Sequence, residues 1–61
     1  MHNLLNEHEA AEYLRCSVAL LRKWRTAGNT GPAFVKIGSL VRYAVEDLEV
    51  FVAANRVGVG R

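Results

Sequence analysis

Two helix start signals, Asn6 and Ser17, lie so close together in this 61-residue chain that only a short helix fits between them. Glu9 stands three residues after Asn6, where its carboxylate can reach back to the Asn6 backbone N–H in a capping box. Ser17 opens a second stretch that ends before Gly28, a residue favoured just past a helix C-terminus. The sequence therefore predicts helices over about residues 7–14 and 18–27, joined by the short turn 15–17.

The second predicted helix has two unlike faces when its residues are placed at about 100° intervals. Leu20, Leu21 and Trp24 share one arc, which we expect to face the core. The rest of the surface carries small residues and bases: Val18, Ala19, Arg22, Lys23 and Thr26 opposite the core, and Arg25 at the border. A helix of this kind is suited to the DNA major groove, because short side chains near its start permit close approach to base edges.

A glycine- and proline-containing loop at 28–32 is followed by two β-prone runs, 34–37 and 40–43, which indicate a hairpin around Gly38. We favour a three-residue loop over 38–40, because a two-residue loop would mix bases with the apolar set. The longer loop would bury Val35, Ile37, Val41 and Tyr43 and place Lys36 and Arg42 together on the outer face. Phe34 would then turn inward near Trp24.

A last helix is predicted over about residues 45–55, with Val45, Leu48, Phe51 and Val52 on one face. Its cap position, Ala44 or Tyr43, is poor for a helix start. The predicted fold is mostly α with a small β-hairpin, in the order helix, turn, helix, hairpin, helix. This is a winged helix-turn-helix domain over residues 1–55, followed by a flexible C-terminal tail over 56–61.

Charge is segregated along the chain. All six acidic residues lie outside residues 15–42, whereas six of the eight basic residues lie within that stretch. Such a distribution is typical of a polyanion binder, with nucleic acid as the leading candidate, although a merely solvated basic face is the alternative.

Composition argues against catalysis and against a metal or cofactor. A chain this short buries only about 60% of the surface exposed when unfolded, which leaves little room for an enclosed substrate cavity. The single cysteine, Cys16, excludes an intrachain disulfide, and His2 and His8 do not complete a metal site. Cys16 has no catalytic partners in the pattern and is interpreted as a small turn residue. With no membrane-span or signal-peptide pattern, we expect a cytoplasmic protein, nucleoid-associated when bound to DNA.

The chain resembles the small excisionase-type winged helix-turn-helix proteins, relatives of the MerR DNA-binding domain. The resemblance runs from Leu4 to about Ala54 and is carried by residues 5–14, 17–24, 31–38, 41–43 and 46–48. The combination is specific: a capped Glu-Ala-Ala helix, a serine-initiated helix ending Leu-Arg-Lys-Trp, a Gly-Pro-x-Phe-x-Lys-Ile-Gly turn and a final Asp-Leu helix.

The resemblance implies that the second helix enters the major groove and that the hairpin wing contacts the flanking backbone or minor groove. On this chain the helix residues are Val18, Ala19, Arg22, Lys23 and Thr26, together with Ser17 and Arg25 at its start and border, and the wing residues are Lys36, Ser39 and Arg42. Two departures matter. The wing tip, Ser39-Leu40, lacks the bases that many such wings carry, which predicts weaker wing binding. No coiled coil or effector domain of a full MerR regulator is present, so no ligand sensing is expected.

Two functions of different classes follow. The first is a double-stranded DNA-binding protein of a mobile element that directs recombination toward excision, with an integrase-type recombinase as partner, or regulates a nearby promoter. Copies of it would associate on adjacent DNA sites. The second is a protein-interaction module on the same scaffold, which would recruit a recombinase or another partner through Val50 and the tail with little DNA affinity.

Overall fold

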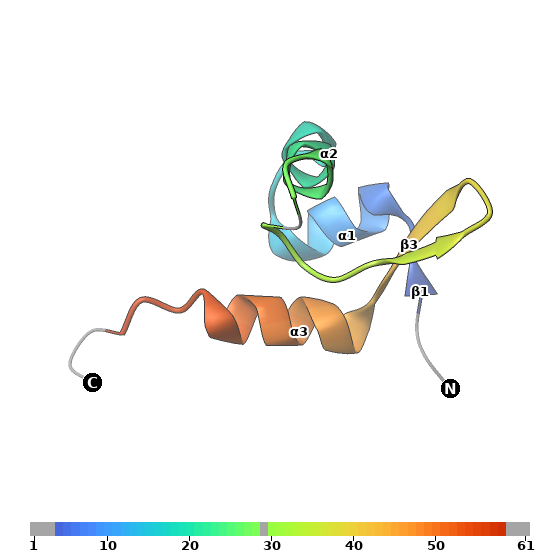
Figure 1. Cartoon of the computed structure of the whole chain (residues 1–61). Helices are drawn as coiled ribbons and strands as arrows, with labels where there is room; N and C mark the ends of the chain where they lie inside the picture. The colour runs from blue at the N-terminus through green and yellow to red at the C-terminus, as the bar shows by residue number, and fades with distance from the viewer. Residues whose placement is uncertain (1–3, 29, 59–61) are drawn as a thin grey trace.

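The computed structural model describes residues 4–28 and 30–58. Its elements follow the order β1 (Leu4–Leu5), α1 (Glu7–Leu14), α2 (Val18–Thr26), β2 (Val35–Ile37), β3 (Leu40–Ala44) and α3 (Val45–Ala54). In Figure 1, α1 lies between α2 and α3, and contacts both, while the strands gather at one end of α1. The predicted helix-turn-helix with a hairpin wing and a C-terminal helix is confirmed.

Local capping chemistry sets the helix starts. The Asn6 side chain accepts a hydrogen bond from the Glu9 backbone N–H at 2.8 Å, and the Asn6 N–H donates to Glu9 Oε1 at 2.9 Å, which completes the capping box. Ser17 Oγ accepts from the Leu20 N–H at 3.1 Å. Ala44, the residue before α3, makes no side-chain cap bond, as expected.

The turn between α1 and α2 depends on Arg15, whose φ of 57° and ψ of 43° lie in the left-handed region. Its N–H donates to the Glu12 carbonyl at 3.1 Å, and the next N–H, of Cys16, donates to the Ala11 carbonyl at 2.9 Å. This pair of bonds is a Schellman motif, which ends a helix and reverses the chain direction. Because Ser17 caps the next helix at once, α2 is set at a definite angle to α1.

A two-residue strand, β1, was not predicted. It pairs antiparallel with β3, with Leu4 opposite Ala44 and Leu5 opposite Tyr43, so the sheet order is β1-β3-β2. The strand is too short to show an alternating pattern, and its partner is distant in the sequence. Its pairing places β3 at the centre of the sheet, where it connects the start of α1 to the wing.

The predicted hairpin register is wrong. Ile37 pairs with Leu40, so the loop holds only Gly38 and Ser39. Gly38 has a φ of 62°, which suits the first position of a two-residue hairpin turn. This local turn preference outweighs the separation of apolar and basic side chains that led us to favour a longer loop.

The shorter loop changes which wing residues share a face, because cross-strand partners in an antiparallel pair lie on the same side. Val35 is opposite Arg42, and Lys36 is opposite Val41. Lys36 and Arg42 therefore lie on opposite faces, contrary to expectation. Three residues expected inside or at the tip are exposed on the Arg42 face: Val35, Ile37 and Leu40.

The core is small and lies where α1, α2, β3 and α3 meet. Its buried members are Ala10, Ala11, Leu21, Tyr43 and Leu48. The two alanines of α1 allow close approach of the neighbouring elements, and the Tyr43 side chain is only 1% exposed. The predicted inward face of α2 is confirmed at Leu21, and Trp24 packs against the core while remaining partly exposed.

The aromatic residues pair differently from expectation. Phe34 turns inward, but its ring lies against Tyr43, with a centroid separation of 6.2 Å. Trp24 instead pairs with Phe51 of α3 at 5.3 Å.

Among the helices in the described part of the chain, none has the length and apolar character that a membrane crossing requires.

Candidate nucleic-acid interface

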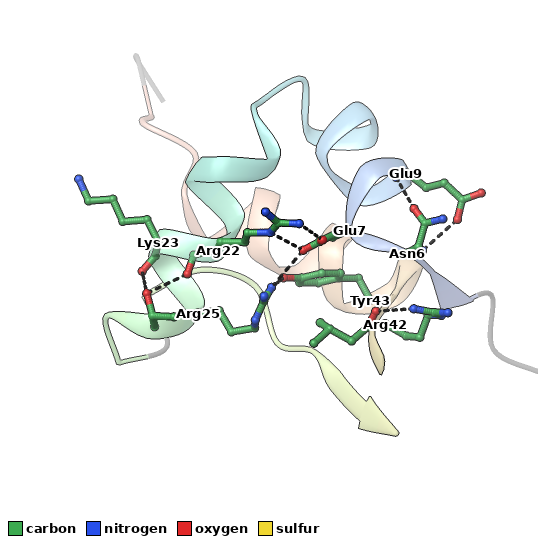
Figure 2. A network of polar contacts seen from close by, with 10 residues as sticks. Asn6, Glu7, Glu9, Arg22, Lys23, Arg25, Arg42 and Tyr43 are labelled. Carbon is green, nitrogen blue, oxygen red and sulfur yellow. Dashed lines mark hydrogen bonds and ion pairs between the residues drawn. The ribbon is translucent and has the colours of Figure 1, made fainter. Parts of the chain in front are cut away.

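An ion pair joins the two helices of the helix-turn-helix. Glu7, in the first turn of α1, accepts from Arg22 of α2 through both carboxylate oxygens: Nε to Oε1 at 3.2 Å and Nη2 to Oε2 at 2.5 Å (Figure 2). The Arg22 hydrogen bond is the main cause that lowers the pKa of Glu7 below its ordinary value of 4.5. In return, the bond to Glu7 raises the pKa of Arg22. An acid from outside the basic stretch thus folds directly onto it.

Arg25 is held on three sides and links α2 to the sheet. Its Nη1 donates to the Tyr43 hydroxyl at 3.0 Å and lies 3.7 Å from Glu7 Oε1. Its guanidinium carbon stands 5.8 Å from the centroid of the Phe34 ring, within the range of a cation–π contact. Only 20% of the Arg25 side chain is exposed, compared with 57% for Arg22. Tyr43 can therefore be buried without leaving its hydroxyl unpaired.

The outer side of α2 is accessible along most of its length. Lys23 is exposed and extends away from the polar network in Figure 2, and its amino group has no hydrogen bond or ion pair with any residue that the structure describes. Ala19 is also exposed, and its short side chain would let this side of α2 come close to DNA. Val18 differs from expectation, since it is half-buried and packs against the core.

Two hydroxyl groups, one at each end of α2, already bond to the helix backbone. Ser17 Oγ accepts the capping bond from Leu20, so its own O–H remains able to donate. Thr26 Oγ1 donates to the carbonyls of Arg22 and Lys23, at 3.0 Å and 3.2 Å, so its lone pairs remain able to accept. Both residues are exposed, one at each end of the helix.

The wing residues are spread over different surfaces. Ser39 is exposed in the turn, and Lys36 is exposed on the β3-paired strand β2. Arg42 is half-buried, and its Nη1 folds back to the Val41 carbonyl at 2.8 Å (Figure 2). The wing therefore does not present Lys36 and Arg42 as one basic edge.

An open groove of about 290 Å³ separates α2 from the wing. Its lining consists of Glu7, Arg22, Arg25, Ser39, Leu40, Val41 and Arg42. It brings together four of the ten residues that the sequence indicated for binding, two from α2 and two from the hairpin. Lys23, Ala19 and Lys36 lie outside it, on other exposed surfaces. The basic groups thus form a groove with flanking positions rather than a flat patch.

The supporting roles of Glu7 and Tyr43 were missed by sequence reasoning. Glu7 was not among the residues expected at the site, and Tyr43 was expected only on the buried face of the hairpin or before the last helix. No local pattern marks a pair such as Glu7 and Arg22, which are separated by fifteen positions. The one available signal was the spacing of Glu7 and Ala10. Residues three apart share a helix face, so Glu7 lies on the same side of α1 as the buried Ala10.

The family model described as helix-turn-helix domain matches residues 4–56, and the chain belongs to this family. A comparison with curated proteins finds no match. Helix-turn-helix domains are a recurrent DNA-binding unit in which the second helix reads the major groove. Within the described residues, no group of three or more His, Cys, Asp or Glu side chains is arranged to hold a metal ion.

Proposed function

We propose that this protein binds specific sequences in double-stranded DNA, with α2 in the major groove and the hairpin on the flanking backbone or minor groove. The observation that carries the proposal is the position of Arg22, which is 57% exposed at the rim of a groove between α2 and the wing. The proposed contacts are the cap residue Ser17, then Val18, Ala19, Arg22, Lys23 and Thr26 from α2, and Lys36, Ser39 and Arg42 from the wing. Arg25 belongs to the set as a support for this surface, because most of its side chain is covered.

The biological role that best fits is that of an excision or architectural factor in site-specific recombination, or a small transcriptional regulator, of a mobile element. This part rests on the resemblance of the motifs in residues 4–54 to excisionase-type proteins. An integrase-type recombinase is the expected protein partner. The protein would act without a cofactor and without catalysis of its own, in the cytoplasm and on the nucleoid.

Useful specificity would require more than one copy. One helix of nine residues can read only a few base pairs, and dimeric helix-turn-helix proteins solve this by binding two half-sites. Here the wing tip lacks a basic residue, so the wing of a single copy adds little to the DNA-binding energy. We therefore expect copies side by side on adjacent repeats.

A second candidate function is supported by the outer side of α3. Val50 is 67% exposed, on a helix opposite the proposed DNA surface. This residue would suit a protein partner such as a recombinase. The tail was included in this hypothesis, but residues 59–61 lie outside the described part of the chain.

Selection of bound sequences from random duplex DNA tests the proposed function. A sequence-specific protein should enrich a short motif, and titration of that motif against a scrambled duplex should show a clear affinity difference. If the basic side chains of the protein contact about four to six phosphates, the binding constant should fall as the salt concentration rises. A plot of the two logarithms should have a slope of roughly −4 to −5. Absent enrichment together with negligible DNA affinity would favour the protein-interaction module.

A further inference from the structure

Arg22 is held along one edge and open along another. A guanidinium group presents five N–H donors in a planar fork. The Glu7 carboxylate occupies the edge formed by Nε and Nη2. The end edge, formed by Nη1 and the second Nη2 hydrogen, makes no hydrogen bond with the residues that the structure describes, and the side chain is 57% exposed. Two parallel donors therefore remain available to a ligand.

Guanine is the base that matches this edge. In the major groove it presents two acceptors side by side, O6 and N7, and a bidentate arginine is the commonest specific contact to them. No other base offers two adjacent acceptors there, since adenine shows an acceptor beside a donor. Arg22 lies on the exposed side of α2, the helix proposed to enter that groove.

Glu7 is suited to hold the arginine in one orientation before DNA arrives. It lies directly after the capping-box residue Asn6, so its backbone is anchored at the start of α1. Its side chain is 21% exposed and is also 3.7 Å from Arg25, which is itself bound to Tyr43. A long side chain fixed in advance loses less conformational freedom on binding. The two arginines also offset the negative charge that would otherwise repel DNA.

We propose that Glu7 is a positioning residue for DNA recognition: it holds Arg22 by the Nε edge so that the Nη1–Nη2 edge reads a guanine in the major groove. This inference rests on the proposed DNA-binding function and deepens it by naming one base and one positioning residue. The competing role for Glu7 is that of a neutralising charge that merely weakens DNA binding. Removal of the carboxylate should weaken binding to the motif if Glu7 positions Arg22. It should instead tighten binding to every duplex if Glu7 only adds negative charge.

The test uses a duplex that contains the selected motif, with each guanine replaced in turn by 7-deazaguanine. This base keeps Watson–Crick pairing but lacks the N7 acceptor. At one position the replacement should lower the affinity of the wild-type protein about 5- to 10-fold, part of the discrimination that a bidentate pair provides. The matched control is Glu12→Gln, which removes an exposed acid from the same helix and should show the same loss.

Two variants should abolish that sensitivity. Glu7→Gln should bind the motif more weakly and show less than about a 2-fold effect of 7-deazaguanine, because Arg22 is no longer fixed. Arg22→Lys keeps the charge but not the planar fork, and it should behave in the same way. The double variant Glu7→Gln/Arg22→Lys should be no worse than Arg22→Lys alone, since Glu7 acts through Arg22. Circular dichroism checks that each variant is folded.

The outcomes separate this inference from the proposed function. Full 7-deazaguanine sensitivity in folded Glu7→Gln, or tighter binding of that variant to every duplex, would overturn the positioning role while DNA binding stands. Full sensitivity in Arg22→Lys would overturn the guanine assignment even if Glu7→Gln fails to fold. Failure of the wild-type protein to enrich any motif would instead count against the proposed function.

Discussion

The Trp24 and Phe51 rings lie 5.3 Å apart between centroids, tilted by 58°, and this contact connects the proposed recognition helix to α3. Trp24→Ala removes the contact and leaves a cavity, so it should lower the free energy of unfolding by about 3 kcal/mol. In a domain this small, that is a large part of the total stability. Thermal unfolding followed by circular dichroism measures the change. Val50→Ala, at an exposed position of α3, is the control and should unfold close to wild type.

Gly31 is required by the same tryptophan. A Cβ at residue 31 would stand 2.8 Å from both Cβ and Cε3 of Trp24, a separation too short for real contacts. Gly31→Ala should therefore destabilise the fold by about 1–3 kcal/mol through overpacking. Gly58→Ala meets nothing within 4 Å and should leave chemical denaturation unchanged. Equal denaturation midpoints for Gly31→Ala and Gly58→Ala would show that residue 31 does not lie close to Trp24 in solution.

The Glu7–Arg22 pair predicts how stability depends on pH. The pKa of Glu7 is lowered in the folded state, so the ionised carboxylate favours folding. Its contribution is present above the unfolded-state pKa and is lost as the pH falls through the folded-state pKa. The stability difference between wild type and Glu7→Gln should be constant from about pH 6 to 8 and should shrink below pH 4.5. A difference that grows on acidification would contradict this assignment.

Local signals in the sequence were sufficient for the helices and their caps. Asn6 with Glu9, and Ser17, each act on backbone groups within three residues, so their effect can be read without knowing the fold. The helix ends at Thr26 and Ala54 differ from expectation by one residue each. Periodicity correctly predicted that Ala19, Arg22, Lys23 and Thr26 are exposed on α2, but it failed for Val18, which is half-buried. Their role in DNA binding stays a prediction.

Features that depend on distant residues could not be predicted. β1 is defined only by its pairing with β3, and the Glu7–Arg22 bond only by the crossing of α1 and α2. The hairpin register failed for a different reason. Two principles competed at residues 38–40, and the turn preference of Gly38 outweighed the separation of charged and apolar faces.

Assembly on DNA can be tested without knowledge of the partner. We expect sedimentation of the free protein to give a mass near 6.8 kDa, that of one chain. Titration of a duplex with several motif repeats should give stepwise complexes in which later steps are tighter than the first. Equal affinities at every repeat, or a tight dimer in free solution, would contradict cooperative binding by monomers.

The most direct test of the central claim compares wild-type protein with Arg22→Ala/Lys23→Ala on the selected duplex, by fluorescence anisotropy at fixed salt. Both side chains are exposed on α2, so thermal unfolding should stay cooperative. If α2 enters the major groove, binding should weaken by about 1–3 kcal/mol for each side chain that reads a base, with discrimination against mismatched duplexes reduced. The control variant Arg56→Ala, which removes a positive charge beyond α3, should bind DNA nearly as tightly as wild type. Unchanged affinity and unchanged discrimination in the folded double variant would contradict the assignment of α2 as the recognition helix.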